Sequence, residues 1–79
     1  MVNPTFFPID PDRLEDAART LACLAAPEVE PALEAAARKY AETLSTQHPD
    51  LPRFVMEYNG RHFAQQAARR ARQIILRLG

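Results

Sequence analysis

The clearest pattern in the chain is a helical one near the carboxyl end. From Arg61 to Leu78 the apolar side chains recur every three or four residues and fall within an arc of about 140° on a helical wheel. All five arginines of this segment lie outside that arc. The pattern predicts an amphipathic helix over 61–78, with Leu76 as the one large apolar residue among the polar positions.

Two further helices are expected earlier in the chain. Asp10 can accept hydrogen bonds from the free amides of a first turn, and proline at the next position loses no donor there, so we expect a helix over 11–26 that Pro27 ends. A second helix that starts around Pro27 to Pro31 and spans about 28–47 tolerates both prolines because they lie in its first turn. The expected inner positions are Leu14, Ala17, Ala18, Leu21 and Ala25 in the first helix and Val29, Leu33, Ala36, Ala37, Tyr40 and Leu44 in the second.

Residues 50–60 are compatible with two structures. As a helix over 51–58, the segment would begin after Asp50 and end at Asn59-Gly60, with Leu51, Phe54, Val55 and Tyr58 inward. As a hairpin over 53–63, two short strands would pair across the same Asn-Gly, which is a strong turn signal. A lone two-stranded hairpin is marginal in water, so we favour the helix.

The first nine residues are expected to form an extended arm, because Pro4 and Pro8 fix the backbone and remove amide donors. Phe6 and Phe7 either cover the helices as a lid or anchor the arm in a groove of a partner. The expected fold class is all-α: one compact bundle of three or four helices over 1–79 with this extended arm. The alternative is an α+β fold with the hairpin at 53–63.

The size of the chain limits its core and its location. A chain of 79 residues buries only about 60% of the surface that its unfolded form exposes, so a partner or a second copy can complete a thin core. No stretch approaches the roughly 20 apolar residues that cross a bilayer, and the amino terminus lacks a signal-peptide pattern. Cys23 is the single cysteine, in keeping with a reducing compartment. We therefore expect a cytoplasmic protein.

Charge is distributed unevenly although the net charge is zero. Residues 1–50 carry four basic and nine acidic side chains, a balance of −5, whereas residues 51–79 carry six arginines and one glutamate, a balance of +5. Such an asymmetry favours self-association, docking on a charged protein or contact with phosphates. The arginines can equally pair with the acidic surfaces of the first two helices.

Side chains suited to catalysis are sparse. The residues best able to bind a metal are His48, His62 and Cys23, which lie on separate elements. Neither Cys23 nor Ser45 has a neighbouring base that would activate it, and two glycines are too few for a phosphate-binding loop. We expect no enzyme activity, no metal and no cofactor.

The expected function is therefore binding. We predict a non-catalytic regulator or inhibitor that blocks a surface of a larger protein, or that pairs with a second copy as a homodimer. The alanine and arginine bias is typical of GC-rich bacterial codons, and small binding proteins that block host enzymes or defence complexes are common in phages and other mobile elements. The candidate contact residues are Phe6, Phe7, Arg61, Arg69, Arg72, Leu76 and Arg77.

The alternative function is nucleic-acid binding through the arginine-rich helix. Tyr58-Asn59-Gly60 has the length of the turn that precedes the recognition helix in helix-turn-helix proteins. A pI near 6.7 and the acidic first half of the chain oppose contact with a phosphate backbone. We therefore place protein binding first.

Overall fold

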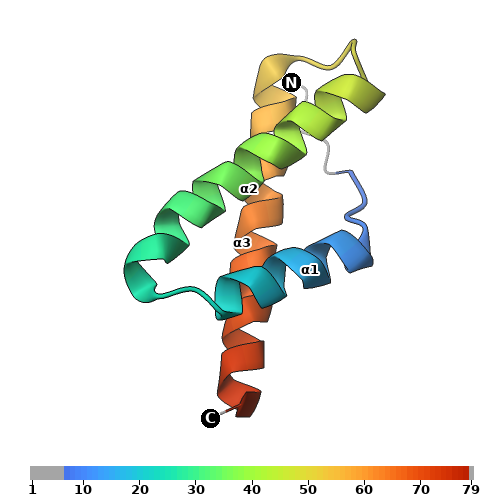
Figure 1. Cartoon of the computed structure of the whole chain (residues 1–79). Coiled ribbons are helices and arrows are strands. Elements are labelled where there is room, and N and C mark those ends of the chain that lie inside the picture. The colour runs from blue at the N-terminus through green and yellow to red at the C-terminus, as the bar shows by residue number, and fades with distance from the viewer. Residues whose placement is uncertain (1–6, 79) are drawn as a thin grey trace.

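The described part of the protein, residues 7–78 of a computed structural model, consists of three helices and a short extended segment. Helix α1 spans Pro11–Ala22, α2 spans Ala26–Gln47 and α3 spans Arg53–Leu78. In Figure 1, α1 and α2 meet at a sharp corner and α3 crosses behind both. The all-α bundle is confirmed, with three helices, and no strand occurs within 7–78, so the hairpin alternative is wrong. No helix in this range is long and apolar enough to span a membrane.

The first helix begins where the sequence predicts and ends earlier. The Asp10 carboxylate accepts a hydrogen bond of 2.9 Å from the backbone N–H of Asp12, which satisfies a free amide of the first turn. The helix ends at Ala22 instead of 26, because a tight turn follows and the backbone at Ala25 is extended, with φ −68° and ψ 151°. The chain can then reverse direction between α1 and α2.

The second helix starts at Ala26, earlier than the expected residue 28, and includes two prolines. Pro27 lies in the first turn, where its missing amide has no partner to lose. Pro31 lies inside the helix, beyond the first turn, so the expectation that both prolines occupy the first turn is wrong. The helix therefore loses one backbone hydrogen bond at Pro31.

The break expected at Asn59-Gly60 is absent, because α3 runs without interruption through both residues. A Cβ built at Gly60 would overlap the carbonyl oxygen of Ala37 on α2 and lie 3.1 Å from its carbonyl carbon. Glycine thus allows a close approach of the two helix backbones. The prediction of separate helices over 51–58 and 61–78 is wrong, because this Asn-Gly pair packs inside a helix and does not reverse the chain.

Asn59 connects α3 to the segment that precedes α1. Its Nδ2 donates a 2.9 Å hydrogen bond to the carbonyl oxygen of Val55, and its Oδ1 accepts one of 2.9 Å from the backbone N–H of Phe7. Asn59 is 2% exposed, so both bonds are shielded from bulk water. Leaving such a buried group without its partner costs about 1–3 kcal/mol. Asn59 therefore fixes the end of the arm against α3.

The core consists of two clusters that share α3. Small side chains dominate the first, which packs α1 on α3 around Ala18, Leu21, Ala67 and Ala71. The second is aromatic and packs α2 on α3, with the Tyr40 and Phe63 rings stacked at a centroid distance of 4.5 Å and an interplanar angle of 2°. Helices α1 and α2 each pack mainly on α3 and contact each other little. The third helix is therefore the common partner of the other two.

We predict that Gly60→Ala destabilises the fold, although alanine favours a helix over glycine by about 1 kcal/mol. The added methyl group has no space beside Ala37 and must push α2 and α3 apart, at an expected cost of about 1–3 kcal/mol. Thermal unfolding followed by circular dichroism measures the change. Gln65→Ala, at an exposed site of the same helix, should leave the melting temperature nearly unchanged. A higher melting temperature for Gly60→Ala would contradict the close approach.

We also predict that Asn59→Ala releases the arm. The backbone amide of Phe7 loses its acceptor, and its hydrogen exchange should accelerate about tenfold or more, the equivalent of about 1.4 kcal/mol. Amide exchange measured by NMR reports this locally. The amide of Ala67, in the first core cluster, serves as the reference for global unfolding. Equal acceleration at both amides would show that Asn59 does not hold the arm specifically.

Candidate functional site

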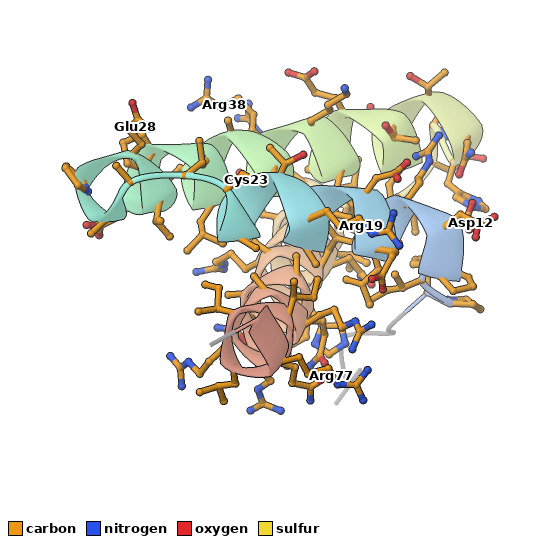
Figure 2. All side chains as sticks on the ribbon, turned by 60° about the horizontal axis from the view of Figure 1, so that its bottom comes forward. Asp12, Arg19, Cys23, Glu28, Arg38 and Arg77 are labelled. Carbon is orange, nitrogen blue, oxygen red and sulfur yellow. The ribbon has the colours of Figure 1, made fainter. Side chains whose placement is uncertain are left out.

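The large apolar side chains that are exposed in residues 7–78 all belong to α3. Phe54 and Tyr58, near its amino end, are 57% and 38% exposed; Ile75 and Leu76, near its carboxyl end, are 50% and 73% exposed. Figure 2 looks from the carboxyl end of α3 and shows α1 and α2 on one side of it. Leu76 is exposed as predicted, whereas Ile75 was expected inward and lies at the edge of the inner arc.

Phe54 and Tyr58 were also expected inward, and both expectations are wrong. Because the helix is continuous, its inner positions include Val55 and Asn59, which are buried. Phe54 and Tyr58 each stand one residue earlier and are rotated by about 100° toward solvent. The signal was present in the chain, since extending the helical wheel of 61–78 back through Asn59 places both aromatic residues on the arginine side.

A single stripe along α3 combines apolar and basic side chains. Its members are exposed and separated by three or four residues, and we call this stripe the outer face of α3: Phe54, Tyr58, Arg61, Gln65, Arg69, Arg72 and Leu76. No ion pair with another described residue involves Arg61, Arg69 or Arg72. The stripe carries no carboxylate. Four of the seven predicted contact residues therefore lie together.

The other three predicted residues do not join this stripe. Arg77 is exposed but stands one residue after Leu76, about 100° around the helix from it. Phe7 is half-buried against the aromatic cluster, and its ring lies 4.9 Å from that of His48. His48, although exposed, thus has an aromatic neighbour. Phe6 lies outside the described residues.

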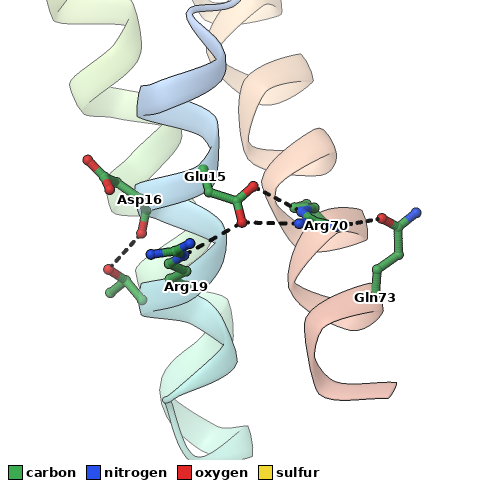
Figure 3. A network of polar contacts seen from close by, with 6 residues as sticks. Glu15, Asp16, Arg19, Arg70 and Gln73 are labelled. Atoms are coloured by element: carbon green, nitrogen blue, oxygen red, sulfur yellow. Dashed lines mark hydrogen bonds and ion pairs between the residues drawn. The ribbon is translucent and has the colours of Figure 1, made fainter. Parts of the chain in front are cut away.

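Arg70 differs from the other arginines of α3 because it reaches a carboxylate on α1. Its Nε and Nη2 donate to the two oxygens of Glu15 at 3.0 and 3.2 Å, and its Nη1 donates to Gln73 at 3.3 Å (Figure 3). The side chains of the Arg70–Glu15 pair are each about one-third exposed. The hydrogen bond from Arg70 lowers the pKa of Glu15 below its usual 4.5. Arg70 thus pairs with an acidic residue of α1, and this ion pair links α1 to α3.

A groove of about 600 Å³ lies beside the amino-terminal half of the outer face. Arg61 belongs to both the groove and the outer face. On α3, Arg53 and Glu57 form an ion pair of 3.7 Å at its edge. Met56 of α3 also lines the groove. The remaining lining side chains belong to α2: Ala37, Arg38, Ala41, Glu42 and Ser45. A concave surface thus adjoins the convex ridge of the helix.

The chemistry available on this side of the molecule is apolar contact and guanidinium donation. Among residues 7–78, no group of three or more histidine, cysteine, aspartate or glutamate side chains could hold a metal ion. Cys23 is exposed directly after the end of α1 and does not belong to the outer face of α3 (Figure 2). The outer face can therefore bind a partner through apolar contacts and through hydrogen bonds and ion pairs of its guanidinium groups.

No family model matches the chain, and comparisons with curated proteins and with solved structures find no significant match. The geometry of this chain is therefore the guide to its function. The feature with the most chemical content in that geometry is the outer face of α3.

We predict that Glu15→Gln lowers the melting temperature at neutral pH. A carboxyl group whose pKa is lowered by folding stabilises the protein above its unfolded pKa, and that contribution disappears as the pH falls through the folded pKa. The difference from the wild type should therefore be complete above about pH 5 and shrink below pH 4.5. Thermal unfolding across this range measures it. Arg70→Gln should give most of the same neutral-pH loss, with little further loss in the double variant, because Glu15 then loses only its exposed ion pair of 3.6 Å with Arg19. A pH-independent difference would contradict the assignment.

Proposed function

We propose that this protein is a non-catalytic regulator or inhibitor that occupies a surface of a larger protein through the outer face of α3. The observation that supports the proposal is the concentration of exposed apolar side chains on one helix, together with three arginines not paired by the described residues. Aromatic residues and arginine are enriched at protein interfaces, where lysine, glutamate and aspartate are depleted. The outer face has this composition.

The size of the face suggests a reversible contact. From Phe54 to Leu76 the helix rises about 33 Å, and its width with side chains is about 10 Å. A strip of these dimensions is at the small end of specific interfaces, whose standard size is about 800 Å² per partner. Small interfaces are typical of transient regulatory encounters.

Nucleic acid is the competing occupant, because three aligned arginines suit a phosphate backbone. A phosphate backbone would engage Arg61, Arg69 and Arg72 but would leave Ile75 and Leu76 in water. A protein surface can cover both kinds of side chain. The apolar ends of the face therefore favour a protein partner.

The proposal predicts a position-dependent cross-link. A photoreactive benzoylphenylalanine at Gln65, in the middle of the outer face, should capture one protein in the cells that naturally make this chain. The same group at Ala35, exposed on α2, is the matched control and should capture none. Adding Arg69→Glu and Leu76→Ser to the Gln65 probe should abolish capture, because both the charge and the apolar contact are removed.

Other products would contradict protein binding to a larger partner. Equal capture from both positions, or none from Gln65, would remove the outer face as the contact surface. A nuclease-sensitive product would support nucleic-acid binding instead. A product of twice the chain mass would identify a second copy as the occupant.

A further inference from the structure

We infer that the element bound by the outer face of α3 is an amphipathic helix with apolar residues at both ends and acidic residues in its middle. The inference rests on the proposed function and specifies the chemistry of the partner. It follows from the shape of the outer face, from the order of its side chains, and from what a second copy of this chain can offer.

The outer face is straight and narrow. Phe54, Gln65 and Leu76 follow one another at intervals of eleven residues, and the other members repeat the same interval. Eleven residues make about three whole turns, so the stripe runs almost parallel to the helix axis for about 33 Å. A straight ridge of this width packs well against a second helix lying alongside. One side of that second helix can pack into the groove next to Arg61.

The order of the side chains determines the chemistry that fits them. Aromatic residues lie at one end of the stripe and Leu76, with Ile75 beside it, at the other. Three exposed arginines and no carboxylate lie between these ends. Covering the arginines without a counter-charge would leave guanidinium groups desolvated and unpaired, which is costly. Acidic residues in the middle of the partner avoid this cost and form charge-assisted hydrogen bonds.

A second copy of the chain meets only part of these requirements. Antiparallel pairing of two α3 helices about Gln65 would match the apolar ends but place Arg61 of each copy opposite Arg69 of the other. Like charges in direct opposition disfavour that arrangement. The acidic sides of α1 and α2 would match the arginines, but in residues 7–78 they expose no large apolar side chain. The occupant is therefore a helix of another protein.

Two synthetic helical peptides of identical composition test the inference. Each is about 22 residues long, to match the length of the outer face. The first carries leucines at both ends of one face and glutamates in its middle; the second has glutamates at the ends and leucines in the middle. Fluorescence anisotropy against the full chain should show at least about tenfold tighter binding of the first, with affinity falling as salt screens the charges.

Variants of the protein identify the surface that binds. Arg69→Glu with Arg72→Glu should weaken binding of the acidic-centred peptide about tenfold or more, because two attractions become repulsions. Arg13→Glu, an exposed arginine on α1 that does not line the groove, should change it less than about twofold. Both substitutions are at exposed positions, and circular dichroism checks that each variant remains folded.

Equal affinity for the two peptides, no binding of either, or no effect of the double charge reversal would each overturn the inference. The cross-linking experiment separates this failure from that of the proposed function. Capture of a protein by the Gln65 probe, combined with failure of the peptides, would remove the acidic helix and leave the outer face as a protein-binding surface. If the peptides and the cross-link both fail, the acidic partner helix and the protein-binding role of the outer face are both excluded.

Discussion

The close approach of α2 and α3 at Gly60 determines the arrangement of the molecule. It requires a residue without a side chain in the middle of a long helix, directly against the backbone of Ala37. Because α3 continues through this contact, its rotation about its own axis is fixed there. Asn59 and Phe63 consequently face inward, and the residues on the opposite side, from Phe54 to Leu76, face solvent. The candidate binding surface is thus a consequence of how two helices cross.

Features that depend on local chemistry were predictable from the sequence. The capped start of α1, the amphipathic carboxyl-terminal segment and the exposure of Leu76 follow from neighbouring residues and helical periodicity. Asn59-Gly60 was not predictable in this way, because the same dipeptide suits a hairpin turn, the end of a helix or a tight helix crossing. Its role is determined by Ala37, which is distant in the sequence. The prediction that Phe54 and Tyr58 face inward was wrong for the same reason, because it assumed that the helix ends at Asn59-Gly60.

The arginines of α3 show a similar limit. Helical periodicity separates Arg70 from Arg69 and Arg72, and the predicted contact residues do not include Arg70, but the sequence does not identify Glu15 as its partner. In the fold, Arg70 faces α1 and reaches both oxygens of Glu15, whereas Arg69 and Arg72 face away. Which arginine forms an ion pair within the protein depends on the orientation of α3 against α1. The acidic and basic halves of the chain therefore neutralise each other only in part.

The central position of α3 also has a consequence for biosynthesis. Helices α1 and α2 leave the ribosome first, yet each packs mainly on the helix that is translated after them. A free helix as short as α1, with 12 residues, is marginal in water. Until most of α3 has emerged, Leu21, Tyr40 and Leu44 therefore lack the α3 side chains that bury them in the native fold. The native packing of α1 and α2 is thus expected to wait until α3 has been translated.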